Sequence, residues 1–84
     1  MAEQRRYECP EIAAFLKRMA RAMVRRAAEG DLEALSALQE SRDAIDVAMT
    51  DAARALHDDF LYSWTQIGTE LHISRQAARQ RFGH

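Results

Sequence analysis

The chain has little of the residues that interrupt helices or cross-link a chain. Its 84 residues contain one proline, three glycines and one cysteine, Cys9. A single cysteine excludes an internal disulfide and leaves no cysteine cluster for zinc. With so few helix breakers, the 16 alanines favour helix over strand. We therefore expect an all-α protein.

Long apolar runs are also missing. No run approaches the roughly 20 residues that a membrane-spanning helix needs. The N-terminus begins with Glu3, Arg5, Arg6 and Glu8 and has no apolar signal core, so secretion is not expected. We expect a cytoplasmic protein with no membrane partner.

Signatures of catalysis are absent as well. The sequence has no glycine-rich phosphate loop and no HExxH zinc motif. His57, Asp58 and Asp59 are adjacent, and adjacent residues do not share a helix face, so we interpret them as a polar helix end rather than a metal site. We expect no enzyme activity, no cofactor and no metal.

Charge is strongly segregated although the net charge is only −1. Residues 1–26 carry a net charge of +4, residues 27–70 carry −8 and residues 71–84 carry +3. A uniformly acidic domain repels nucleic acid, but basic ends can present positive surfaces to phosphate. The charge distribution alone is equally consistent with arginine-rich helix faces that contact only water.

A first helix is predicted over about residues 10–28. Pro10 fits the first turn, where its missing N–H is not needed, and Gly30 fits the position just after the helix end. Apolar residues at steps of three and four predict one amphipathic stripe. Its members are Ile12, Phe15, Leu16, Met19 and Met23.

A second, longer helix is predicted between Asp31, which can cap its start, and Asp59. Seven positions alternate steps of three and four, which is typical of a heptad seam. They are Leu35, Leu38, Arg42, Ile45, Met49, Ala52 and Leu56. Either the first helix folds back across Gly30 to cover this seam, as in a monomeric hairpin, or a second chain covers it. We favour a homodimer, because a hairpin of this size has a thin core.

The last third of the sequence predicts two short helices. Ser63 and Gln66 form a capping box, so a helix starts near Trp64, with Ile67 and Leu71 on its buried side. Gly68 lies between them, where we expect a closely crossing helix to leave no room for a side chain. Ser74 caps a final helix from Arg75 to about Phe82, and Gly83 ends it. The packing side of that helix consists of Ala77, Ala78 and Phe82.

The string Ser-Trp-x-x-Ile-Gly-x-x-Leu-x-Ile-Ser-Arg-Gln-Ala-Ala, within residues 63–83, resembles the helix-turn-helix of small bacterial and phage DNA-binding regulators. It is also similar to the unit in region 4 of sigma factors. The resemblance implies a helix-turn-helix unit over residues 60–84. The apolar periodicity of the preceding part predicts a long helical hairpin over residues 1–59, which we interpret as the dimerisation element. The family usually has glycine in the turn where this chain has His72, a residue type that tolerates a positive φ better than most.

The resemblance implies a transcriptional regulator that binds double-stranded DNA as a homodimer, with the helix over residues 75–82 in the major groove. Arginine pairs with guanine and glutamine with adenine through two hydrogen bonds each. The expected base-contacting residues are Ser74, Arg75, Gln76, Arg79 and Gln80. The expected phosphate-contacting residues are Thr65 and Gln66 at a helix start, and Arg81, which points away from the base-reading face.

Two alternatives stay open. The final helices could dock a transcription or phage protein, with the acidic middle helix carrying the contact. Cys9, at a helix start, could link two chains in response to oxidation.

Overall fold

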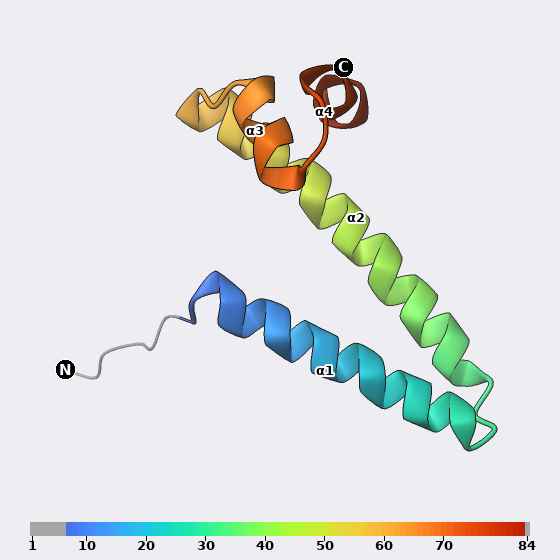
Figure 1. Ribbon diagram of the computed structural model, residues 1–84. Coiled ribbons are helices and arrows are strands. Elements are labelled where there is room, and N and C mark those ends of the chain that lie inside the picture. Colours follow the sequence, from blue (N-terminus) through green and yellow to red (C-terminus); the bar gives the residue numbers. More distant parts are fainter. Residues whose placement is uncertain (1–6, 84) are drawn as a thin grey trace. The chain divides into compact units, whose positions relative to one another are not determined.

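The computed structural model describes residues 7–83, and every regular element in that range is a helix (Figure 1). The helices are α1 (Cys9–Ala28), α2 (Glu33–Phe60), α3 (Trp64–Leu71) and α4 (Arg75–Phe82). The prediction of an all-α protein is therefore confirmed. Across residues 7–83, no helix is long and apolar enough to cross a membrane. The prediction about the N-terminal signal concerns Glu3, Arg5 and Arg6, which lie outside the described residues.

Two compact units make up the chain, one ending at Ser41 and the other beginning at Arg42. The first unit contains α1 and the start of α2. The second contains the rest of α2 together with α3 and α4. The C-terminal half of α2 therefore belongs to the same compact unit as α3 and α4.

The end of α1 is set by Gly30. Its φ is +91°, and its N–H donates to the Ala27 carbonyl at 2.9 Å. The next N–H, that of Asp31, donates to the Arg26 carbonyl at 3.0 Å. This pair of bonds satisfies carbonyls at the helix end and requires a left-handed residue, which glycine adopts without strain. The predicted stop at Gly30 is confirmed.

Asp31 caps the start of α2, as predicted. Its Oδ1 accepts from the N–H of Glu33 at 3.0 Å, and its carbonyl accepts from the N–H of Ala34 at 3.2 Å. The regular helix then begins at Glu33, two residues later than the cap. Ala34 is buried beside this turn.

The core of the second unit consists of Ala53, Ile67, Ala78 and Phe82, with Met49, Trp64, Leu71 and Ile73 packed against it. The face of α2 that enters this core only partly matches the predicted seam. Met49 contributes, but the neighbouring Ala53 is buried while the predicted Ala52 and Leu56 stay exposed. The apolar pattern alone could not distinguish two adjacent alanines, one facing α3 and α4 and the other facing away.

Candidate nucleic-acid interface

The start of α3 is held by a reciprocal capping box. The Ser63 hydroxyl accepts from the Gln66 N–H at 3.1 Å, and Gln66 Oε1 accepts from the Ser63 N–H at 2.8 Å. These bonds satisfy two of the N–H groups that a helix start leaves without an internal partner. The predicted box is confirmed, and it fixes where the chain turns into α3.

A three-residue turn, 72–74, separates α3 from α4. His72 adopts the left-handed conformation (φ 59°, ψ 37°), and its N–H donates to the Thr69 carbonyl at 3.2 Å. The Ile73 N–H donates to the Gly68 carbonyl at 2.9 Å. The positive φ expected of His72 is confirmed, so residues 64–82 form two helices and not one continuous rod.

Gly68 allows the turn to lie directly against α3. A Cβ at this position would stand 2.7 Å from the Ile73 carbonyl oxygen and 3.0 Å from the Ser74 carbonyl oxygen. Real Cβ atoms do not come within 2.7 Å of a backbone oxygen, and a turn backbone cannot move aside cheaply. The need for a small residue was predicted, but the close neighbour is the turn backbone and not a crossing helix.

The start of α4 repeats the serine cap. The Ser74 hydroxyl accepts from the Ala77 N–H at 3.0 Å, as predicted. Ala78 and Phe82, one turn apart, are the two most buried residues of the core, with exposed fractions of 0% and 1%. The same face of α4 therefore always points inward, which fixes the direction of its other side chains.

The outward face of α4 carries the candidate base-contacting residues. Gln76, Arg79 and Gln80 line one shallow surface hollow together with Gly83. Arg75 lies one turn before Arg79 and is also exposed. Over residues 7–83, neither the Arg75 nor the Arg79 guanidinium forms an ion pair with a carboxylate. Both charges are thus available to a partner molecule.

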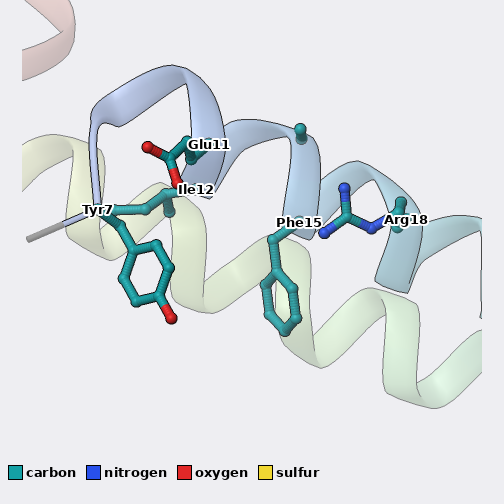
Figure 2. Close-up of a pocket in the computed structure, with 6 residues that line it drawn as sticks. Tyr7, Glu11, Ile12, Phe15 and Arg18 are labelled. Atoms are coloured by element: carbon teal, nitrogen blue, oxygen red, sulfur yellow. The ribbon is translucent and has the colours of Figure 1, made fainter. Parts of the chain in front are cut away.

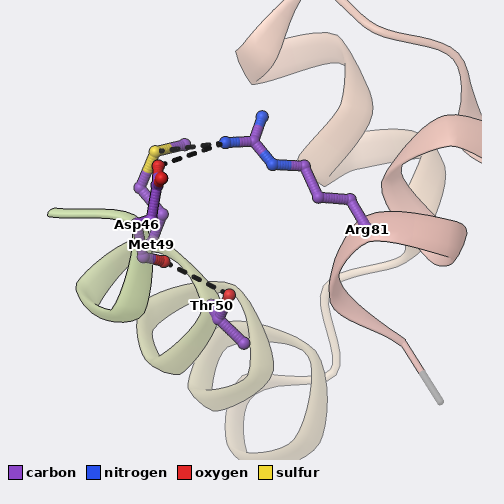
Figure 3. Close-up of polar contacts among 4 residues, drawn as sticks. All are labelled: Asp46, Met49, Thr50 and Arg81. Atoms are coloured by element: carbon purple, nitrogen blue, oxygen red, sulfur yellow. Dashed lines mark hydrogen bonds and ion pairs between the residues drawn. The ribbon is translucent and has the colours of Figure 1, made fainter. Parts of the chain in front are cut away.

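Arg81 is oriented differently from the other arginines of α4. Its Nη2 lies 4.0 Å from Asp46 Oδ1 and 3.8 Å from the Met49 sulfur, both on α2 (Figure 3). The guanidinium also lies 5.0 Å from the centroid of the Phe82 ring. Arg81 therefore points away from the face of Gln76 and Gln80, as expected, and its nearest charged neighbour is a carboxylate of this chain.

Thr65 and Gln66 occupy the first turn of α3 and are exposed. The N–H groups of the first helical positions have no acceptor within the helix, so Thr65 presents a backbone donor to solvent. The Gln66 side-chain oxygen is engaged by Ser63, which leaves its NH₂ group as the free donor. Both residues keep the donors that a phosphate contact requires.

Two residues of α2 position this surface, although the sequence analysis did not mention Arg54 and interpreted His57 only as part of a polar helix end. Arg54 donates from Nε to the Phe82 carbonyl at 2.9 Å, a cation at the negative end of α4. His57 stacks on the Trp64 ring with centroids 4.0 Å apart, and its Nδ1 lies 2.7 Å from the Tyr62 carbonyl oxygen. Both residues follow Met49 and Ala53 along one side of α2, and this spacing could have predicted that they face α3 and α4.

The other polar clusters add no competing site. His57 is used in packing, and in the part of the chain that is described no group of three His, Cys, Asp or Glu side chains could hold a metal ion. Cys9 is a free, exposed thiol at the first position of α1.

No protein-family model, curated protein or solved structure matches this chain. The functional assignment therefore depends on the geometry of α3, the turn and α4.

Proposed function

We propose that this protein is a sequence-specific regulator that binds double-stranded DNA through a helix-turn-helix formed by α3, the turn and α4, and that it acts as a homodimer. The supporting observation is the outward face of α4, on which arginine and glutamine side chains are exposed and unpaired with acids. A rigid helix carrying such side chains matches the width of the DNA major groove.

In this proposal the base edges are read from α4. Arg75 and Arg79 donate to guanine O6 and N7, and Gln76 donates to and accepts from adenine. Ser74 and Gln80 flank this row, one at the N-terminal end of α4 and the other a turn beyond Gln76. Each well-formed pair discriminates against a wrong base by about 1–3 kcal/mol.

Phosphate contacts fix the register of the protein on the duplex. Thr65 and Gln66 supply them from the positive end of the α3 dipole. Arg81 supplies a further phosphate contact when its guanidinium leaves Asp46 and binds a phosphate instead. The existing pair is long and exposed, so it opposes this exchange only weakly.

A dimer is needed because one recognition helix contacts few base pairs. Two copies place two α4 helices on half-sites about 34 Å apart, one turn of the duplex. In the proposed arrangement α1 and α2 form the helical hairpin that joins the copies.

The first test is a fluorescence-anisotropy titration of a bound duplex at several salt concentrations. Each phosphate neutralised by arginine releases counterions, so the logarithm of the association constant should fall steeply and linearly with the logarithm of salt. Arg75→Ala should reduce the preference for the best sequence by roughly tenfold or more while non-specific binding persists.

Arg21→Ala is the matched control, because it removes the same charge from an exposed position of α1 opposite the apolar stripe and should leave sequence preference unchanged. If both variants lose sequence preference equally, Arg75 contributes only its positive charge and reads no base. Binding that does not respond to salt, or no binding, would contradict the proposal.

A protein-docking function is the second candidate. Phe60 and Leu61, at the α2–α3 junction, are 70% and 83% exposed and follow Asp58 and Asp59. Exposed apolar residues beside acids are typical of a contact surface for a basic protein. Retention of a transcription protein by the immobilised chain, lost in Leu61→Ser and retained in Arg75→Ala, would favour this function.

A further inference from the structure

Arg79 lines two surface hollows at once. The first is the hollow on the outward face of α4, which it shares with Gln76 and Gln80. The second, which we call the α2–α4 hollow, has polar and aromatic lining from three helices of the second compact unit: Arg54, His57, Asp58, Trp64 and Arg79. One side chain therefore connects the proposed base-reading face with a separate polar site.

Arg54 borders the α2–α4 hollow with most of its donors unused. Its Nε donates to the Phe82 carbonyl at 2.9 Å, and this bond holds the guanidinium in place. A guanidinium has five N–H donors, so the four on the two Nη atoms remain. Within residues 7–83 these four have no hydrogen-bond or ion-pair partner. Arg54 is thus a positioned cation with donors available to an anion.

Positive charge is in excess around this hollow. Arg54 and Arg79 contribute two positive charges, and Asp58 is the one acid among the described residues that line it. Asp58 forms no ion pair with either arginine in the part of the chain that is described. A net charge of +1 remains, and the two like charges repel each other until an anion lies between them.

The size and the donors of the hollow favour a phosphate group. Its volume is about 240 Å³. Pockets for drug-sized ligands have roughly 300–1,000 Å³, so this hollow suits a smaller ligand. Guanidinium groups bind phosphate oxygens through two parallel N–H···O bonds. The stacked rings of His57 and Trp64 contribute an aromatic wall beside these donors.

A hollow on α1 provides a comparison, because it also has an arginine. Its lining includes Tyr7, Glu11, Ile12 and Phe15, with Arg18 at the rim (Figure 2). The Arg18 guanidinium lies 5.9 Å from the centroid of the Phe15 ring. One cation and one acid leave this lining without net charge. The excess of positive charge therefore distinguishes the α2–α4 hollow from the α1 hollow.

We infer that the α2–α4 hollow binds a small anion that carries a phosphate group, held between the guanidiniums of Arg54 and Arg79. Arg54 supplies the fixed half of the site, and Arg79, which already lines the hollow, supplies the other half. Arg79 cannot hold this anion and donate to guanine at the same time. Binding of the anion is independent of DNA, whereas this mutual exclusion rests on the proposed function.

Fluorescence of Trp64 measures the binding directly, because Trp64 is the only tryptophan and lines the hollow. Inorganic phosphate is titrated into the full chain without DNA at neutral pH, with chloride adjusted to keep the ionic strength constant. The wild type should show a saturable change. Arg54→Gln should raise the dissociation constant for phosphate roughly tenfold, because it removes one of the two charged donors. Arg18→Gln is the matched control and should bind as the wild type does.

Asp58→Asn distinguishes loss of the site from loss of the fold. It removes the acid that lines the hollow, so it should lower the dissociation constant for phosphate several-fold, which unfolding cannot do. A wild type that responds to phosphate no more than to chloride would overturn the inference. So would an Asp58→Asn variant that binds no more tightly than the wild type, or equal weakening in Arg18→Gln.

The exclusion is measured with DNA present at constant ionic strength. Inorganic phosphate should weaken binding of the preferred duplex by the wild type and leave its binding by Arg54→Gln unchanged. Phosphate that binds the hollow without weakening duplex binding would contradict the shared use of Arg79.

A backbone phosphate of DNA is the other source of the same chemical group. If Arg54→Gln weakens binding of every duplex and Asp58→Asn strengthens it, with no free phosphate present, the hollow takes a DNA phosphate and the small ligand is wrong. Phosphate binding by a chain without sequence-specific DNA binding would contradict only the proposed function.

Discussion

At the scale of single residues, Gly68 is a position where the neighbouring backbone leaves no room for a side chain. Alanine at this position would place a methyl group 2.7 Å from the Ile73 carbonyl oxygen. The turn must then shift away from α3, and overpacking of this kind costs about 1–3 kcal/mol of stability. Urea unfolding of Gly68→Ala should show that loss. Thr69→Ala, its exposed neighbour, is the control, and equal stability of Gly68→Ala and wild type would contradict the described contact.

Residue-scale features were predictable where a chemical signature exists. The serine caps, the Gly30 stop and the left-handed His72 follow from residue type and spacing. Leu61 also has a positive φ, of 61°, and nothing in the sequence indicated it, because leucine rarely adopts this conformation. Leu61 is exposed, and the next N–H, that of Tyr62, donates to the Leu56 carbonyl at 3.1 Å, a local bond at the end of α2.

At the scale of elements, the joint between α2 and α3 depends on His57. The ring stacks on Trp64 and bonds to the Tyr62 carbonyl, so two separable interactions hold the start of α3. His57→Phe keeps an aromatic stack and removes the bond, whereas His57→Ala removes both. We expect a loss of about 0.5–1.5 kcal/mol in the first variant and roughly twice that in the second.

Denaturant unfolding followed by the fluorescence of Trp64, the only tryptophan, measures both variants. Equal loss in the phenylalanine and alanine variants would mean that the stack contributes nothing. No loss in either would remove His57 from the joint.

Element boundaries were well predicted, but the pairing of their faces was not. The four helices begin and end within two residues of their caps because the capping residues are local in sequence. Which side of α2 meets α3 and α4 depends on contacts distant in sequence. Heptad spacing therefore indicated Ala52 and Leu56, while the core includes Ala53 and the polar residues Arg54 and His57 complete the packing.

At the scale of the whole molecule, few residues are buried for a chain of this length. Among residues 7–83, the buried hydrophobic residues are Ala34, Ala53, Ile67, Ala78 and Phe82. Only two of these side chains are large, so a single copy has little apolar burial to offset the entropy of ordering four helices. This thin core is the reason for which the sequence analysis favours a homodimer.

The central claim is that α4 reads base edges, and selection from random double-stranded DNA tests it most directly. The bound fraction is sequenced after several rounds with the wild-type chain and with Arg79→Ala. We predict an inverted repeat whose half-sites are about one helical turn apart, with the guanine preference at one position lost in the variant. A wild-type pool that remains random, or an identical pool from the variant, would contradict the account.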